Sequence, residues 1–257
     1  MKSLTGKTIL LTGAAGGLGH EYTKQLLELG AHLVLTDLDQ SAPEAMSGLQ
    51  KNTPGTIKGY IAADISSVQG CTVLYEKIKE ISPNIDMLIN NAGIISYGYF
   101  HDIPDTQLEK LIQVNLLAPM WLSKLFVPDM IQRGQGHLVF TCSLAGIIGT
   151  SQSTAYAASK FGMRGFAVSL ADEVKNKGIA TTIIYPSWIK TKLLDSPEFG
   201  SSDMKSVPPL FAENPMKVVR ESIKGIRKNR RHIYPGPVAK FMAILNKIKP
   251  VVVKQAH

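Results

Sequence analysis

A tyrosine and a lysine at a helical spacing are the clearest chemical feature of the chain. Tyr156 and Lys160 are four residues apart in a segment, 154–177, whose pattern predicts a helix, so their side chains share one face. A phenol with an ordinary pKa of ~10 is a poor base near neutral pH. A neighbouring ammonium favours phenolate, and a pKa lowered by ~3 units corresponds to ~4 kcal/mol. The pair is therefore a candidate proton donor and acceptor, although the same spacing also occurs in ordinary surface helices.

A glycine-rich run, Thr12-Gly13-Ala14-Ala15-Gly16-Gly17-Leu18-Gly19, connects a predicted strand to a predicted helix. Gly13 allows a tight turn, Gly17 lets the main chain approach a phosphate, and Gly19 lets helix and strand pack closely. The free N–H groups and the dipole at the helix start favour a pyrophosphate. In this context the run predicts dinucleotide binding, whereas an isolated glycine cluster could equally be a flexible turn.

Asp37 directly follows the next predicted strand. A carboxylate at this place can hydrogen-bond an adenosine ribose 2′-OH and repels a 2′-phosphate. Asp39 is the competing candidate, but Asp37 is the residue that ends the apolar run. No Lys or Arg interrupts the glycine run, and Leu38 follows Asp37. These residues favour NAD over NADP.

Three further features follow in chain order: Asn90-Asn91-Ala92-Gly93, Asn115 and Ser143. Together with the glycine run and the Tyr156–Lys160 pair, they make the chain resemble the short-chain dehydrogenase/reductase family over about residues 5–235. The resemblance implies an NAD(H)-dependent enzyme that moves a hydride between nicotinamide and a secondary alcohol or ketone, with Tyr156 as acid and base. It also implies dimers or tetramers formed through the two long helices.

The resemblance assigns individual roles as well. Ser143 orients the substrate oxygen, Lys160 binds the nicotinamide ribose, and Asn115 anchors a water that links Lys160 to solvent. On the residues alone, Asn115 could instead cap a helix kink and Ser143 a turn. The implied catalytic set is Asn115, Ser143, Tyr156 and Lys160. The implied cofactor contacts are Gly13, Gly17, Leu18, Gly19, Asp37, Asp64, Ile65, Asn91, Ala92, Gly93, Tyr156, Lys160, Pro186, Ile189 and Thr191.

The segment Pro186-Ser187-Trp188-Ile189-Lys190-Thr191 departs from the family pattern at one position. The family usually has Pro-Gly here, with a threonine that reaches the nicotinamide carboxamide. Thr191 matches, but Ser187 replaces the glycine, so the local backbone and the pocket floor are expected to differ. No metal site is expected.

Substrate contacts are expected from loops at the carboxyl ends of the strands. The implied contacts are Ser143, Leu144, Tyr156, Ser187 and Trp188. The same loops carry the apolar residues Ile94, Ile95, Tyr97, Tyr99, Phe100, Ile147, Ile148, Leu193, Leu194 and Phe199. They favour a hydrophobic substrate that is steroid-like, retinoid-like or an acyl chain, unless they fill core or oligomer contacts. A 3-oxoacyl-type ketone reductase and a non-catalytic NAD-sensing protein are the alternatives.

Short apolar runs alternate with longer amphipathic ones along the chain, which predicts an α/β fold with a Rossmann-like, doubly wound parallel sheet of about seven strands and helices on both faces. One domain over 1–236 is expected, with a substrate lid at about 187–214. The predicted strands are 8–11, 32–36, 57–62, 86–90, 136–142, 179–185 and 231–234. The predicted helices are 17–29, 42–50, 67–81, 105–132, 154–177, 215–229 and 238–248.

The positive charge is concentrated at one end of the chain. The net charge of +8 divides into −2 for residues 1–216 and +10 for residues 217–257. This distribution argues against a broad nucleic-acid surface, and nucleic acid is not the expected partner. Residues 237–257 are expected to form a basic amphipathic extension. It either packs on the body or another subunit, or docks on an anionic membrane.

Two unclustered cysteines among 257 residues favour a reducing compartment over a disulfide. Neither a signal peptide nor a membrane-spanning helix is expected, because every apolar run is short. The sequence therefore predicts a cytoplasmic protein, with the basic extension as the only candidate for peripheral membrane contact.

Overall fold

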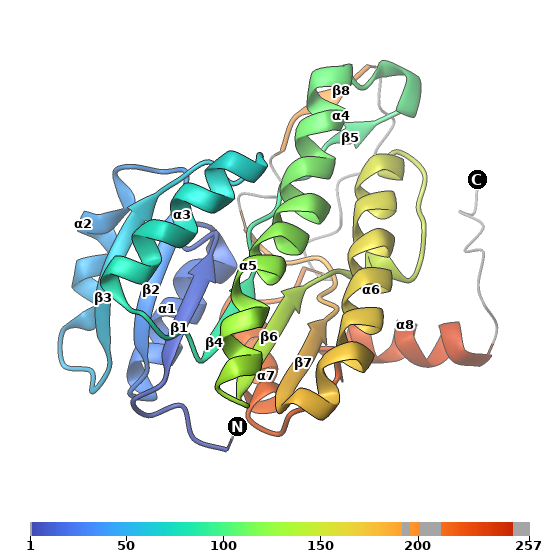
Figure 1. Ribbon diagram of the computed structural model, residues 1–257. Coiled ribbons are helices and arrows are strands. Elements are labelled where there is room, and N and C mark those ends of the chain that lie inside the picture. The colour runs from blue at the N-terminus through green and yellow to red at the C-terminus, as the bar shows by residue number, and fades with distance from the viewer. Residues whose placement is uncertain (1, 192–195, 201–211, 249–257) are drawn as a thin grey trace.

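The computed structural model describes residues 2–191, 196–200 and 212–248. Its centre is a seven-stranded parallel sheet with the strand order β3-β2-β1-β4-β6-β7-β9 (Figure 1). The strands are β1 (Thr8–Thr12), β2 (His32–Asp37), β3 (Thr56–Ala62), β4 (Met87–Asn90), β6 (Gly136–Thr141), β7 (Ile179–Ile184) and β9 (His232–Ile233). The predicted Rossmann-like fold is confirmed, and all seven predicted strands are present.

Helices cover both faces of this sheet. They are α1 (Gly17–Glu28), α2 (Ala42–Ser47), α3 (Val68–Ile81), α4 (Asp105–Ile112), α5 (Ala118–Gln132), α6 (Thr154–Val174), α7 (Pro215–Ile226) and α8 (Pro237–Ile248). In Figure 1, α3, α5 and α6 lie in front of the sheet, and α1 and α7 lie behind it. Successive strand residues point to opposite faces: Leu10 packs with the α3–α5–α6 layer, whereas Ile9 and Leu11 pack with α1 and α7. Both faces are apolar because both are covered.

The long helix predicted at 105–132 contains an irregular turn. Residues Gln113–Leu117 between α4 and α5 form a π-helical segment, a feature that often marks functional sites. By length and composition alone, Asp105–Gln132 could cross a membrane, with 44% of its apolar part buried. The expectation from the sequence that no helix spans a membrane stays a prediction, because a core helix passes the same test. In this fold the helix packs against α3 and α6, so it serves as a covering layer.

A second, two-stranded parallel sheet joins β5 (Tyr97–Gly98) to β8 (Glu198–Phe199). Residues 187–214 were expected to be one irregular lid, but β8 and a bridge between Ile189 and Glu213 give regular pairing inside this range. The predicted lid residues 192–195 and 201–211, including Leu193 and Leu194, lie outside the described residues.

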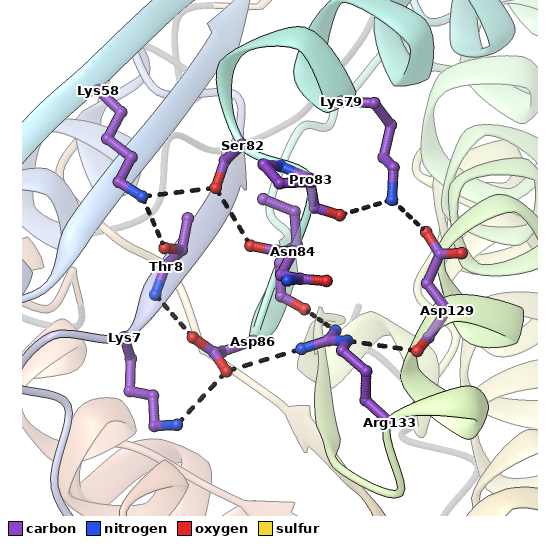
Figure 2. A network of polar contacts seen from close by, with 11 residues as sticks. Lys7, Thr8, Lys58, Lys79, Ser82, Pro83, Asn84, Asp86, Asp129 and Arg133 are labelled. Atoms are coloured by element: carbon purple, nitrogen blue, oxygen red, sulfur yellow. Dashed lines mark hydrogen bonds and ion pairs between the residues drawn. The ribbon is translucent and has the colours of Figure 1, made fainter.

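A network of polar contacts ties together the opposite edge of the sheet, where the strands begin (Figure 2). The Asp86 carboxylate accepts a hydrogen bond from the main-chain N–H of Thr8 at 2.9 Å and lies 3.4 Å from Lys7 Nζ and 3.8 Å from Arg133 Nη1. Arg133 also donates to the carbonyl of Ile85 at 2.6 Å. The network joins the starts of β1 and β4 to the end of α5, which leaves the carboxyl edge of the sheet for chemistry.

Candidate active site

Residues of the candidate site follow the strands at one edge of the sheet. Because the strands are parallel, their carboxyl ends meet there. Gly13 follows β1, Asn91 follows β4, Ser143 follows β6 and Pro186 follows β7, while Asp37 ends β2. The fold therefore brings together residues that are as much as 173 positions apart in the chain.

The glycine loop has the geometry expected from its sequence. Gly13 has φ +68°, and a Cβ there would lie 2.7 Å from Ala92 Cα. A Cβ at Gly19 would lie 2.0 Å from the Gly13 carbonyl oxygen. Both positions therefore require glycine. At Gly17, a Cβ would lie 2.5 Å from Thr191 Cγ2, so the loop faces the predicted nicotinamide segment.

Asn91 and Thr12 hold this loop in place. The Asn91 amide donates to the carbonyls of Thr12 and Gly13, each at 3.1 Å. In return, the Thr12 hydroxyl accepts the N–H groups of Asn91 and Ala92, each at 3.0 Å. Asn91 therefore acts on the glycine loop through hydrogen bonds. Thr12 was not predicted as a site residue, and its position at the start of the glycine run was the available signal.

Asp37 lies beside the glycine loop at the end of β2. Its carboxylate accepts hydrogen bonds from the main-chain N–H of Ala15 at 2.9 Å and of Leu38 at 2.7 Å. These contacts place the carboxylate at the strand–loop–helix junction, and its ribose-binding role stays a prediction. The competing candidate Asp39 instead accepts from the Ser41 N–H and hydroxyl.

The residues present fit a dinucleotide. The first turn of α1 has no side-chain cap at Gly16, so its N–H groups are available to a phosphate. Ile65 is buried in the core, and Leu18 is partly buried against it. Asp64 accepts from the N–H of Ser66 at 2.9 Å, and this contact leads the causes that lower the pKa of its carboxyl.

Tyr156, Lys160 and Ser143 come together where β6 ends and α6 begins. Lys160 Nζ lies 5.6 Å from the centroid of the Tyr156 ring and donates to the carbonyl of Thr141 at 3.1 Å. The Ser143 hydroxyl lies close enough to Tyr156 to lower the pKa of the phenol, and it accepts the N–H of Ala145 at 3.1 Å. The three predicted catalytic groups thus converge, and the turn-capping role considered for Ser143 is also present.

The pKa values of the pair differ from the expectation. Burial raises the pKa of Tyr156 above its ordinary value, and the nearby Ser143 hydroxyl only partly opposes this. Burial lowers the pKa of Lys160 to about 8. The prediction that Lys160 lowers the pKa of Tyr156 was therefore wrong in direction for this structure. Desolvation, which the sequence does not show, is the largest cause of both shifts.

Asn115 is fully buried in the π-helical segment. Its amide accepts the N–H of Ile94 and donates to the carbonyl of Ile94, each at 2.8 Å, and it also donates to the Ser159 hydroxyl at 3.2 Å. A Cβ at Gly93 would lie 3.3 Å from Asn115 Oδ1 and 3.5 Å from Lys160 Nζ. Asn115 thus ties the helix to the loop after β4 beside Lys160, and its water-anchoring role stays a prediction.

The segment after β7 lies at the same carboxyl edge of the sheet. The carbonyl of Pro186 accepts the N–H of Leu144 at 2.9 Å, which joins this segment to the turn that carries Ser143. Ile189 is buried, Trp188 is 42% exposed, and Thr191 faces Gly17. Ser187, which replaces the family glycine, has a buried hydroxyl.

Apolar side chains lie around Tyr156. One cluster packs Tyr156 with Ile94, Phe199 and the α4 residue Leu111. Tyr97 is 8% exposed, and its hydroxyl is near enough to Tyr156 to raise the pKa of the latter. By contrast, Leu144, Ile147 and Ile148 belong to the main core, as the structural interpretation of these residues predicted. Tyr99 and Phe100 are exposed.

Comparison with known proteins adds independent evidence. The family model described as short chain dehydrogenase matches residues 7–198. The chain belongs to the short-chain dehydrogenase family. Human epidermal retinol dehydrogenase 2 is 33% identical over 97% of this chain and 80% of its own length. Human estradiol 17-beta-dehydrogenase 11 is 30% identical over 97% of this chain and 81% of its own length.

The fold is similar to a solved member of the same family. A short-chain dehydrogenase/reductase from Burkholderia phymatum, in complex with NAD, has a TM-score of 0.85 at 20% identity, with 100% of both chains covered. Together with the family membership, these findings make the chain an oxidoreductase of the alcohol dehydrogenase type that uses a nicotinamide cofactor. Family membership and the enzyme class were both predicted correctly from the motifs.

Proposed function

We propose that the protein is an NAD(H)-dependent oxidoreductase that interconverts a hydrophobic secondary alcohol and its ketone, of steroid-like or retinoid-like shape. The observation that carries the proposal is the convergence of Ser143, Tyr156 and Lys160 beside an apolar cluster that contains Phe199. The names of the retinol and estradiol dehydrogenase relatives support this substrate class. An acyl-chain ketone reductase is the competing enzyme.

Nicotinamide supplies or accepts the hydride in this chemistry. Tyr156 carries the matching proton to or from the substrate oxygen, and Ser143 hydrogen-bonds and orients the same oxygen. Because burial raises the pKa of Tyr156, the phenol is protonated at neutral pH and is ready to donate to a carbonyl oxygen. Gly13, Gly17, Gly19 and Asp37 would hold the adenosine and phosphate half of the cofactor. Lys160, Pro186, Ile189 and Thr191 would hold the nicotinamide half.

Replacing the proton carrier tests this proposal. In Tyr156→Phe, turnover of NADH with a panel of hydrophobic ketones is expected to fall ~100-fold or more, because general acid–base catalysis contributes at least that much. The NADH dissociation constant, measured by fluorescence titration, is expected to stay within about twofold. Turnover retained in the variant would contradict the role of Tyr156. A parent protein that binds NADH but turns over no ketone or alcohol would favour the non-catalytic NAD-sensing alternative.

A cytoplasmic location, a homodimer or homotetramer, and peripheral membrane contact through residues 237–257 are parts of the same proposal. One observation favours the membrane contact: α8 exposes Phe241 to 61%, Ile244 to 57% and Leu245 to 37%. Its other side packs on the body through Ala239 and Ala243, which are buried. Residues Pro237–Ile248 of the extension therefore form a helix, α8, that packs on the body and keeps an exposed apolar face, and we assign residues 1–236 to a single catalytic domain.

A further inference from the structure

Glu213 lies where the segment after β7 meets the start of α7. Its main-chain N–H donates to the carbonyl of Trp188 at 2.8 Å, and its carbonyl accepts the N–H of Lys190 at 3.1 Å. These two bonds bridge Glu213 to Ile189 as parallel neighbours. The main chain of Glu213 therefore holds the segment Pro186–Thr191 in place.

The side chain of Glu213 points to a different element, the start of α8. Gly236 packs directly against its carboxylate, since a Cβ on Gly236 would lie 1.8 Å from Glu213 Oε2. The N–H of Val238, in the first turn of α8, lies close enough to the carboxylate to lower its pKa. A negative group is favoured there because it meets the unpaired N–H groups and the positive end of the helix dipole.

The Glu213 carboxylate also lies beside Ser187 of the active-site segment. The Ser187 hydroxyl lies beside Glu213 and lowers the pKa of its carboxyl, although burial, the larger effect, raises that pKa overall. Ser187 Oγ and Glu213 Oε1 are both buried, and neither has a partner at normal hydrogen-bond distance within the described residues. The one departure from the family pattern in this segment thus faces Glu213.

A second carboxylate at the start of α8 does not reach the active-site segment. Glu221 of α7 accepts from Lys240 Nζ at 2.7 Å and from the N–H of Gly236 at 3.3 Å. It fastens the same helix end as Glu213 but has no hydrogen bond to residues 186–191 within the described part of the chain. A comparison of Glu213 with Glu221 therefore distinguishes stabilisation of α8 from positioning of the segment Pro186–Thr191.

We propose that Glu213 is a positioning residue of the active site, which fixes the segment Pro186–Thr191, and with it Trp188, to the start of α8. Trp188 then stands at a set place in the substrate wall, and Ile189 and Thr191 at set places on the nicotinamide side. The consequence for turnover rests on the function proposed above, whereas the position of the segment does not.

Tryptophan emission tests the position of the segment directly. The chain has two tryptophans, so Trp121→Phe leaves Trp188 as the single probe. In that background, Glu213→Ala is expected to shift the emission to longer wavelength and to raise acrylamide quenching about twofold. Glu213→Gln, which keeps the shape and an acceptor for the Val238 N–H, is expected to restore most of the parent signal. Glu221→Ala is the matched control and is expected to leave it unchanged.

Steady-state kinetics and melting complete the test. Glu213→Ala is expected to raise KM for the best ketone of the panel ~10-fold while kcat stays within about threefold. Glu221→Ala is expected to lower the melting temperature without moving KM. Equal quenching in the parent and Glu213→Ala, or equal changes in Glu213→Ala and Glu221→Ala, would reduce Glu213 to a helix cap and overturn the proposal. If no ketone is turned over, the proposed function fails, and the emission result still decides the role of Glu213.

Discussion

Lys160 is buried and Tyr156 is half-buried, and desolvation shifts their pKa values in opposite directions. It raises the pKa of the phenol and lowers that of the ammonium to about 8, because it disfavours the charged form of each group. At neutral pH the pair therefore consists of a neutral phenol and a mostly protonated amine. A buried ammonium in this place costs stability, so the site trades stability for chemistry.

This cost is measurable as a function of pH. A change in the pKa of Lys160 from 10.5 to about 8 corresponds to about 3 kcal/mol of destabilisation below pH 8. Lys160→Met also loses the hydrogen bond to Thr141, worth about 1 kcal/mol. The variant is therefore expected to be more stable than the parent by about 2 kcal/mol at pH 7 in urea unfolding, with little or no turnover.

The sign of the pH dependence follows from proton linkage. Between pH 8 and 10.5 the unfolded chain still holds the Lys160 proton and the folded chain has lost it, so the parent gains stability as pH rises. The advantage of Lys160→Met should be full below pH 8 and gone by pH 10.5. Lys175→Met, whose side chain is 57% exposed, should show no such trend. A constant difference across the pH range would contradict the lowered pKa of Lys160.

Asp37 offers a second prediction at the residue scale. Its carboxylate lies at the end of β2, where it can bind a 2′-OH and repel a 2′-phosphate. Asp37→Ser is expected to weaken NADH binding ~10-fold and to strengthen NADPH binding, so that the preference relaxes or reverses. Fluorescence titrations with both cofactors measure it, with Asp39→Ser as the neighbouring control. Tighter binding of NADPH than NADH by the parent would overturn the NAD assignment itself.

At the scale of elements, the sequence predicted those helices and strands that have a periodic apolar pattern. The seven strands and the helices were found because apolar runs of 4–8 residues and amphipathic segments repeat over many positions. The pairing of β5 with β8 was missed, since each strand has two residues and the partners are about 100 positions apart. The π-helical turn at Asn115 was missed as well, because a helix with one irregular turn keeps nearly the same periodicity.

The site was predicted by residue type, and its electrostatics were not. The glycine loop, Asp37, Ser143 and the Tyr156–Lys160 pair lie together at the carboxyl edge of the sheet, as chain order and parallel strands require. The pKa of Tyr156 was predicted in the wrong direction because burial depends on the packing of distant residues such as Phe199. Glu213 was missed because its contacts join segments that no motif relates.

The network at the opposite edge of the sheet gives a prediction about stability. Asp86 accepts the N–H of Thr8 and lies between Lys7 and Arg133, with its side chain only 16% exposed (Figure 2). Asp86→Ala removes the carboxylate that the Thr8 N–H and the Arg133 cation face. The free energy of unfolding is therefore expected to fall by about 2 kcal/mol. Asp172→Ala, which removes exposed ion pairs, is the control and should change stability by less than about 1 kcal/mol. Equal effects would show that the Asp86 network adds no more than surface pairs.

At the scale of the whole molecule, chemistry and charge occupy different parts. The carboxyl edge of the sheet carries the site, whereas the excess positive charge belongs to residues 217–257, with a net charge of +10. Within the described residues, Lys240 is paired with Glu221, and Arg231 with Asp172. Figure 1 shows α8 extending sideways, away from the sheet. A positively charged region that carries an exposed apolar helix face is suited to contact an anionic lipid surface.

Point variants on α8 test membrane contact better than a truncation would. Ala239 is fully buried and Met242 packs against the core, so deleting residues 237–257 would also uncover the body. Phe241→Ser, Ile244→Ser and Leu245→Ser combined change only exposed side chains. If these side chains insert into lipid, the triple variant loses roughly 3 kcal/mol of apolar transfer, or about 100-fold in binding to phosphatidylserine-containing vesicles. NADH affinity should not change, because none of the three residues is part of the site.

A matched control tests whether vesicle binding depends on the apolar face of α8 or on any exposed apolar surface. Val68 and Val73 on α3 are 56% and 37% exposed, so Val68→Ser with Val73→Ser removes apolar surface at another place and should leave vesicle binding intact. Co-sedimentation at low and high salt reports the electrostatic part, which salt should weaken. If the triple variant binds vesicles as the parent does, α8 is not the docking surface. If instead the parent binds no vesicles and its oligomeric state in solution changes in the triple variant, the apolar face of α8 contacts a second copy of the chain.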